Sequence, residues 1–248
     1  MADSNAAGAL PIWARAEPAT RQPRFSRDQI AGTALAIADA YGFEAVSMRK
    51  IAAVLGAGTM SLYRYIATKD DLLALIDDAI VGEALVPTEL PADWRVALAQ
   101  VARYTRQAFL HHPWAVQALQ GRPAGEAALS GPNRLRHFEQ SLAAVAGAPL
   151  DTTGKLDLLA IVDDYVFGHL LRAAEITARS AASQDSVAGI AGGFTADQLR
   201  SGDFPQLAAL TDDPAARTVS DAGRMNEQFE RGLRVLIDGF ASGTVDKD

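Results

Sequence analysis

The sequence predicts an all-α fold in two parts: a small N-terminal three-helix unit that contains a helix-turn-helix, and a larger helical domain that follows it. Apolar residues recur at three- and four-residue steps in the long segments. No segment shows the alternation of apolar and polar residues that is typical of a strand. Residues 47–66 place a glycine turn between two short helical patterns, which is the spacing of a helix-turn-helix.

The composition limits the class of protein. The 248 residues are 49% hydrophobic, which is enough for a sizeable core in one or two domains. No apolar run reaches the roughly 18 residues of a membrane span, and the N-terminus lacks the pattern of a signal peptide. The absence of cysteine excludes disulfides and thiolate metal sites. We therefore expect a cytoplasmic protein with no membrane partner, no metal and no cofactor.

The N-terminal residues and the first helix differ in pattern. Residues 1–25 are rich in alanine and proline and lack helical periodicity, so we expect a disordered arm. Ser26 and Gln29 have the spacing of a capping box, and a helix follows that ends at Gly42. Its predicted buried stripe consists of Ile30, Ala34, Ile37, Ala38 and Tyr41.

The helix-turn-helix begins at Ser47, whose hydroxyl suits a helix cap. Gly56 then lets the backbone reverse before a second helix opens near Thr59. Leu62 and Ile66 are expected to anchor that second helix in the core. The predicted buried face of the first motif helix consists of Ile51, Ala52, Val54 and Leu55.

The other face of the second motif helix carries hydroxyl, aromatic and guanidinium side chains. Such groups suit base edges and phosphates better than a core, so we expect this face to contact DNA. It consists of Thr59, Met60, Ser61, Tyr63, Arg64 and Tyr65.

Two further cations belong to the predicted DNA surface. Lys69 follows Thr68, the expected cap of a third helix that runs to about Ala84, and a cation there is favourable if a phosphate docks at the helix start. Arg49 lies in the first turn of the first motif helix, within reach of a guanine or a phosphate. Simple solvation is the alternative for both. The complete predicted DNA-binding set is Ser47, Arg49, Thr59, Met60, Ser61, Tyr63, Arg64, Tyr65 and Lys69.

The charge distribution favours one DNA-facing end. The net charge is −7, but residues 15–70 carry eight bases and five acids, whereas residues 71–248 carry 15 bases and 24 acids. A basic end on an acidic body leaves one surface that tolerates phosphates. The arginines of the arm (Arg15, Arg21 and Arg24) are placed to enter a minor groove beside it. A tail without a role is the alternative.

The motif resembles the TetR family of transcriptional regulators. The resemblance is carried by Leu55-Gly56, by Ser61 to Tyr65 and by Lys69 to Leu73, and it covers residues 26–85. It implies a TetR-type DNA-binding domain over those residues. It further implies a homodimeric repressor that binds a palindromic operator in double-stranded DNA and is released by a small-molecule effector.

Residues 92–242 are expected to form a helical effector-binding and dimerisation domain. A long helix is predicted over about Lys155 to Arg179, and a final helix over about 221–240, with a loop rich in Ala, Ser and Gly after residue 180. In TetR-like regulators, this long helix and the final helix pair with a second subunit as a four-helix bundle. The alternative is that both apolar stripes complete one core.

This domain also resembles the tetracycline-repressor type of C-terminal domain, in its helix order and in the Gly-Arg-Pro stretch that starts at Gly121. The positions of that family's metal-chelate ligands fall at Ala118 and Arg172, which do not coordinate magnesium. Tetracycline–magnesium binding is therefore not expected, and the effector is unknown. The candidate ligand residues, each with a satisfied core residue as the alternative, are Tyr104, Trp114, Gln117, His137, Asp164 and His169.

Two other classes of function remain as alternatives. A helical enzyme would use Asp163, Asp164 and His169 for acid-base chemistry, but the chain has no P-loop, dinucleotide fingerprint, nucleophile elbow or HExxH pair. A DNA-binding protein without an effector would have a small or strongly basic body, whereas this body is large and acidic. A ligand-responsive regulator fits better, and we assign no catalytic residue.

Overall fold

The computed structural model describes residues 12–17, 25–118, 131–182, 195–212 and 222–242, and within them it contains helices and no strand. The predicted all-α class is confirmed. We call residues 12–83 the head; its elements are η1 (Ile12–Ala14), α2 (Arg27–Tyr41), η2 (Phe43–Ala45), α3 (Met48–Val54), α4 (Thr59–Leu62) and α5 (Lys69–Glu83). We call residues 94–242 the body; its named elements are α6 (Trp94–His111), α7 (Pro113–Ala118), α8 (Pro132–Ala144), α9 (Thr152–Ala182), α11 (Pro205–Asp212) and α12 (Ala222–Ser242).

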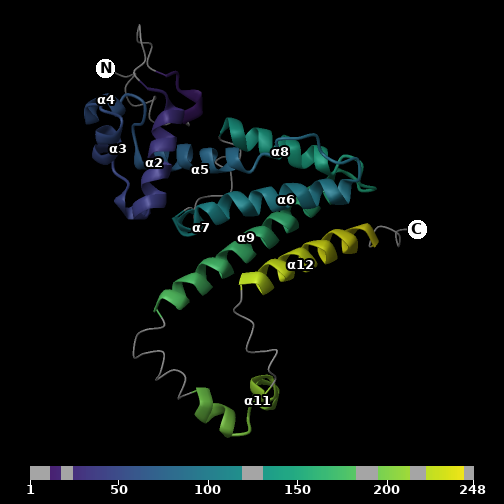
Figure 1. Cartoon of the computed structure of the whole chain (residues 1–248). Helices are drawn as coiled ribbons and strands as arrows, with labels where there is room; N and C mark the ends of the chain where they lie inside the picture. The colour runs from purple at the N-terminus through teal and green to yellow at the C-terminus, as the bar shows by residue number, and fades with distance from the viewer. Residues whose placement is uncertain (1–11, 18–24, 119–130, 183–194, 213–221, 243–248) are drawn as a thin grey trace.

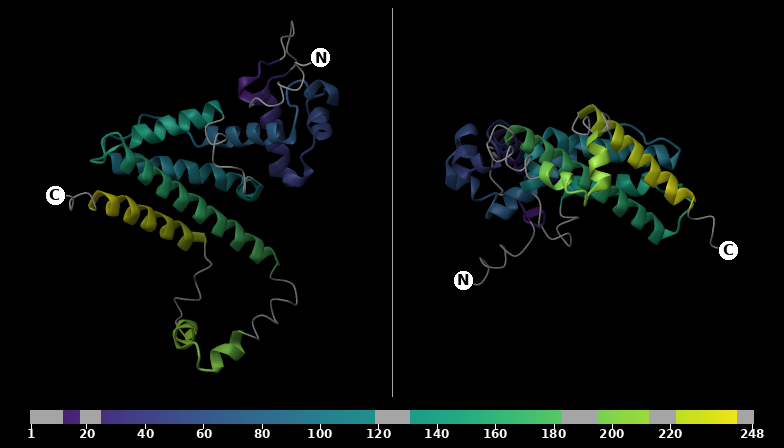
Figure 2. Two further views of the ribbon diagram at one scale, coloured as in Figure 1. Left: turned by 180° about the vertical axis from the view of Figure 1, so that it is seen from behind. Right: turned by 90° about the horizontal axis from the view of Figure 1, so that it is seen from below.

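The head and the C-terminal helix lie at opposite ends of the molecule. Figure 1 shows α3 and α4 at the outer edge of the head. Helix α5, the last helix of the head, packs against α6 and α8 of the body. In the body, α9 packs against α6, α7 and α12. The view from behind in Figure 2 shows α9 and α12 side by side and α11 apart from the bundle. None of the described helices is long and apolar enough to cross a membrane.

A single cluster of buried apolar side chains runs through both parts. It includes Ile30 and Ile76 in the head and Leu98, Leu158 and Phe229 in the body. Because the core is continuous, the head is packed on the body and not merely tethered to it. A movement of one part is therefore constrained by the other.

The predicted helix starts are confirmed by their caps. Ser26 and Gln29 form the expected capping box, and Thr68 forms a second one with Asp71. The hydroxyl of Ser47 accepts a hydrogen bond from the amide of Lys50 at 3.2 Å. Gly56 has a φ of 61°, a conformation that suits glycine at the turn between α3 and α4.

Three residues differ from the predicted burial. Tyr41 and Val54 are 69% and 64% exposed because they line an open groove between α2 and α3, where Lys50 places its ammonium 3.8 Å from the Tyr41 ring. Tyr65 was expected on the DNA-facing surface but is 4% exposed. Helix α4 ends at Leu62, so Tyr65 leaves the helical register and packs against Phe25 with ring centroids 5.0 Å apart.

The disordered arm is a wrong prediction for residues 12–17. Ile12 is buried in the core, and Arg15 pairs with Asp71 at the start of α5. The guanidinium of Arg27 donates to the carbonyl oxygen of Arg15 at 2.7 Å. These contacts join residues far apart in the sequence, so local periodicity does not predict them. Arg21, Arg24 and the Gly-Arg-Pro stretch lie outside the described residues.

Candidate DNA-binding surface and effector site

The exposed surface of the head is built by α3, α4 and the start of α5. Arg49, Tyr63, Arg64 and Lys69 are exposed, and Met60 is 78% exposed. Leu62 and Ile66 are fully buried beneath them, as predicted, and hold this surface on the core. These exposed guanidinium, ammonium and phenol groups can donate hydrogen bonds to phosphates and to base edges.

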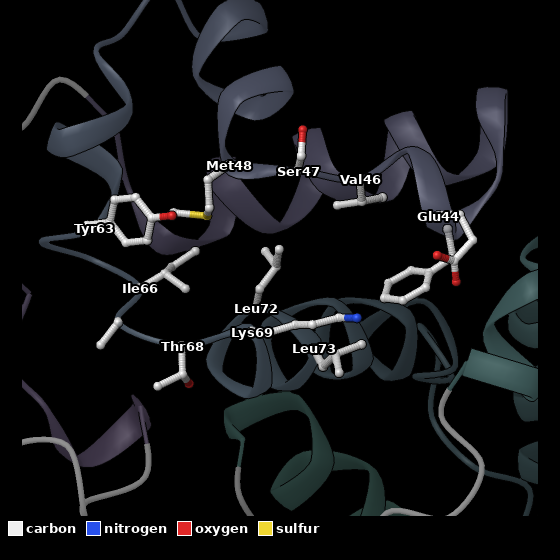
Figure 3. A pocket seen from close by; sticks show the side chains of 12 residues that line it. Glu44, Val46, Ser47, Met48, Tyr63, Ile66, Thr68, Lys69, Leu72 and Leu73 are labelled. Atoms are coloured by element: carbon white, nitrogen blue, oxygen red, sulfur yellow. The ribbon is translucent and has the colours of Figure 1, made fainter.

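A hollow of about 450 Å³ opens on this surface between the start of α3 and the start of α5. Figure 3 shows apolar side chains converging on its floor, among them Val46, Met48 and Leu72. Polar groups of Ser47, Tyr63, Thr68 and Lys69 also line it. The hollow thus combines an apolar floor with hydroxyl and ammonium groups, and Glu44 also lines it.

The start of α5 is held in place by a buried carboxylate. Asp71 accepts hydrogen bonds from the backbone amides of Ala67 and Thr68 at 2.9 and 3.0 Å and pairs with Arg15. Burial alone would raise the pKa of Asp71, but the Arg15 and backbone hydrogen bonds outweigh it and lower that pKa. Lys69 is therefore presented from a firmly fixed helix start.

A second polar cluster joins the head's last helix to the body. Arg134 of α8 donates to both carboxylate oxygens of Asp77, at 2.8 and 2.9 Å. The neighbouring Asp78 accepts from the backbone amides of Asn133 and Arg134 at 3.1 and 3.0 Å, so it caps α8 from outside the helix. Gly131 lies so close to Asp78 that a Cβ atom would overlap its carboxyl group. Helices α5 and α8 are thereby clamped together.

Polar groups of three body helices gather near this clamp. The Thr105 hydroxyl of α6 lies 2.8 Å from Nε2 of His137 on α8. Burial, helped by the charge of Arg134, lowers the pKa of His137 to about 4, so the imidazole is neutral at pH 7. On α9, burial raises the pKa of Asp163 to about 6 although its side chain remains accessible to water. An accessible carboxyl surrounded by protein is suited to meet a small ligand.

His169 lies elsewhere in the body. It is buried between α9 and α12, with its ring 5.0 Å from that of Phe229, and its Nε2 has no hydrogen-bond partner in the structure. Burial, with Arg106 and Arg172 nearby, lowers its pKa to about 4. Because His169 packs on α12 and Asp163 interacts with α8, these two side chains do not form an acid-base pair. Within the described residues, no three His, Asp or Glu side chains are grouped to hold a metal ion.

Comparison with known proteins identifies the family of this chain. Residues 30–76 match the family of bacterial regulatory proteins of the tetR type, and residues 86–243 match the tetracyclin repressor-like C-terminal domain. The chain belongs to the TetR family. Both predicted resemblances are thus confirmed, and the protein is a transcriptional regulator with a helix-turn-helix head.

Two relatives and one solved structure illustrate the similarity. An HTH-type transcriptional regulator of Saccharopolyspora erythraea is 34% identical over 234 residues, which cover 93% of this chain and 91% of the relative. The HTH-type transcriptional repressor DrrR1 of Streptomyces coeruleorubidus is 32% identical over 232 residues, with 87% and 80% covered. The structure of Streptomyces coelicolor ActR in complex with actinorhodin has a TM-score of 0.69 and 26% identity, and covers 92% of this chain and 100% of ActR.

The predicted DNA-binding residues of this TetR-family chain are brought together on the head, with one exception. Ser47, Thr59 and Ser61 lie at or near the starts of α3 and α4, next to the exposed residues Met60 and Arg64. Tyr65 is the exception, because its ring is in the core.

The six predicted ligand residues are not brought together. Tyr104 packs on a small apolar cluster with Val101, and Gln117 and Asp164 are exposed. Trp114 stacks on Phe43 of the head. His137 and His169 lie in the two separate environments described above.

Sequence reasoning missed the residues that connect helices: Asp39, Asp77, Asp78, Thr105 and Arg134. Polar residues on largely apolar helices were the available signal. The signal does not say which of them will meet.

Proposed function

We propose that this TetR-family regulator is a repressor that binds a palindromic operator as a homodimer and is released by a small-molecule effector. The observation that carries the DNA-binding part is the exposed cationic and aromatic surface around the hollow on the head. The relative DrrR1 is described as a repressor. We propose Ser47, Arg49, Thr59, Met60, Ser61, Tyr63, Arg64 and Lys69 as the DNA-contacting residues.

A homodimer follows from the size of the reading surface. One recognition helix contacts only a few base pairs, whereas two helices about 34 to 36 Å apart read two half-sites. On α12, the stripe of Phe229, Leu233 and Ile237 is buried against the same chain, so the alternative of one completed core accounts for that stripe. Val235 of α12 and Ile161 of α9 remain 65% and 38% exposed. We propose that these outer faces of α9 and α12 pair with a second copy.

The effector is proposed to bind in the body. ActR, at 25–26% identity, has been crystallised with actinorhodin and with (S)-DNPA. In this chain the groups that best fit such a role are the neutral His137, the hydroxyl of Thr105 and the accessible carboxyl of Asp163. Of the six residues predicted from the sequence, His137 is therefore the strongest candidate.

DNA selection from a random library, followed by titration of the selected site, tests the DNA-binding surface. Because each of two heads loses two contacts, Arg64→Ala with Lys69→Ala should weaken binding at least about 100-fold without changing the melting temperature by more than a degree or two. Arg136→Ala with Arg200→Ala is a matched control, since it removes the same charge from exposed body sites. Unchanged affinity in the head variant would contradict the proposal.

A thermal-shift screen of small molecules tests the effector. A hit should raise the melting temperature of the wild type and weaken DNA binding, and it should do both less well in His137→Ala. A hit that stabilises the protein yet leaves DNA affinity unchanged would favour the alternative of a DNA-binding protein without a regulatory effector.

A further inference from the structure

The contact between the head and the kink that separates α6 from α7 is unusually polar. His112 is the C-cap of α6, and its carbonyl oxygen accepts a hydrogen bond from the amide of Ala115 in α7 at 2.8 Å. Its side chain is 7% exposed. Nδ1 lies 2.7 Å from a carboxylate oxygen of Asp39 on α2, and Nε2 lies 3.2 Å from a carboxylate oxygen of Glu83, the last residue of α5.

Trp114 extends this contact toward the DNA-binding surface. Its indole Nε1 donates to Asp39 at 2.8 Å, to the same oxygen that His112 contacts. The indole stacks on Phe43 of η2, with ring centroids 5.4 Å apart and planes 10° apart. Phe43 in turn lines the hollow on the head, and the ammonium of Lys69 lies 5.8 Å from its ring centroid. A chain of contacts thus runs from the body to a wall of the hollow.

We call Asp39, Phe43, Glu83, His112 and Trp114 the junction cluster. It fastens the body to three separate elements of the head: α2, η2 and α5. Attachment at three separate elements fixes the orientation of one part on another more firmly than attachment through one helix. The other extensive contacts between head and body are those of α5 with α6 and α8. The junction cluster therefore supplies the orientation that α5 alone does not.

Stability is a poor explanation for such a cluster. A buried group paired with carboxylates loses hydration that the new contacts only partly restore, and well-packed apolar side chains often do as well or better. What polar contacts add is a unique geometry, because hydrogen bonds tolerate little change in distance and angle. The carboxylate of Asp39 is fixed by two donors from two different residues, which makes this point of the contact directional.

We propose that the junction cluster sets the distance between operator half-sites that the dimer accepts, with His112 and Trp114 as positioning residues. The inference rests on the proposed binding of a palindrome by a homodimer. Moving two half-sites apart by one base pair shifts one of them by about 3.4 Å and turns it by about 34°. A head with a fixed orientation cannot follow that change, whereas a head that is held to the body through α5 alone follows it more easily.

The test compares spacing preference, which a general loss of stability would not alter. Operators are made with the selected half-site and with spacings changed by −2, −1, 0, +1 and +2 base pairs. For the wild type, a change of one base pair should weaken binding at least about tenfold. In His112→Gln and in Trp114→Leu, the ratio of the affinities for the unchanged and the changed spacing should fall below about threefold. Trp114→Phe keeps the stack on Phe43 and should recover part of the preference.

His111→Gln is the matched control. His111 is the exposed neighbour of His112. Its side chain hydrogen-bonds to Gln107 at 2.9 Å, and its ring centroid lies 6.5 Å from that of His112. The spacing preference of the His111→Gln variant should equal that of the wild type. If His112→Gln and Trp114→Leu weaken binding by the same factor at every spacing, the cluster is merely structural and the inference is overturned.

A measurement without DNA separates this inference from the proposed function. The chain has no cysteine, so Ala36→Cys, at an exposed position of α2, introduces a single site for a spin label. The distance between the two heads of the dimer should have a narrow distribution in the wild type, a broad one in His112→Gln and a narrow one in His111→Gln. Equal widths would overturn the inference even if DNA binds. If the selection yields no DNA site, or if the label shows no second head at any distance, the proposed function itself is contradicted.

Discussion

The head and the body use polar side chains in opposite ways. In the head, most polar contacts are local: Ser26, Ser47 and Thr68 cap helices through residues three positions away. The polar contacts that join one body helix to another, or the body to the head, connect distant residues. Thr105 and His137 are 32 residues apart, Asp77 and Arg134 are 57 apart, and Asp39 and Trp114 are 75 apart.

This difference separates what each part can do. Local caps free the outer side chains of the head for another molecule, because the helices need no help from them. In the body the polar side chains hold helices to one another, so a ligand that touches them also touches the connections between helices. The head is therefore suited to bind, and the body to respond. Four predictions test this comparison.

Gly131→Ala should have the largest effect on stability. The new methyl group would overlap the Asp78 carboxyl group that caps α8, and the clamp between α5 and α8 must open to admit it. We expect a loss of about 2 kcal/mol in the free energy of unfolding, measured by denaturant titration. Gly147→Ala is the control, since a Cβ atom there meets nothing within 4 Å. Equal losses in the two variants would show that the clamp carries little energy.

Acid should destabilise the body through His137 and His169. Their pKa values of about 4 lie below the ordinary value of 6.5, so between these values the unfolded chain binds protons that the folded chain does not. Stability is then lost as the pH falls from 6.5 toward 4. Asp163, with a pKa of about 6, acts in the opposite direction between about pH 4 and pH 6, but less strongly because its carboxyl is accessible to water.

With two groups against one, we expect a net loss of about 2 kcal/mol between pH 7 and pH 5. Melting temperatures measured across that range give the slope. His137→Gln and His169→Gln should each flatten it, and the exposed His111→Gln should not. A slope that neither of these two variants changes would contradict the pKa assignment.

Ser47→Ala should lower the free energy of unfolding less than Gly131→Ala does, because the contact that it removes is local. The amide of Lys50 loses its capping oxygen, and a lost N-cap costs about 1 kcal/mol. Denaturation without DNA measures this effect, with Ser61→Ala as the control since Ser61 lies inside α4 and caps nothing. A cost equal to that of Gly131→Ala would break the contrast between local and distant contacts.

Arg103→Ala should have the smallest effect although its contact spans 127 residues. The guanidinium donates to Glu230 of α12 at 2.7 and 3.0 Å, but the Arg103 side chain is 48% exposed. Exposed ion pairs contribute less than about 1 kcal/mol. A double-mutant cycle with Glu230→Ala measures the pair alone. A coupling of several kcal/mol would mean that separation in sequence, and not burial, decides the energy.

The sequence was sufficient for the elements whose signals are local. The helix starts at Ser26, Ser47 and Thr68 and the turn at Gly56 follow from neighbouring residues. Tyr65 was misplaced because the pattern does not show that α4 ends at Leu62.

Partners across the fold could not be predicted. In the sequence, nothing distinguishes Arg134 from other helical arginines, because its partner Asp77 is far away in the chain. Trp114 was predicted as a ligand residue, but in the structure it contacts Phe43 and Asp39. Tertiary packing decides these contacts, and the candidate effector site depends on them.

The docked segment at residues 12–17 has a consequence for where the DNA-binding unit begins. The match to the tetR family starts at residue 30, yet Ile12 fills a place in the core and Arg15 neutralises the buried Asp71. A chain trimmed to residue 26 would leave a hole in the core and an unpaired carboxylate beneath Lys69. The working head is thus longer than the motif that identifies it, and a minimal fragment chosen from the motif alone would be a weaker protein.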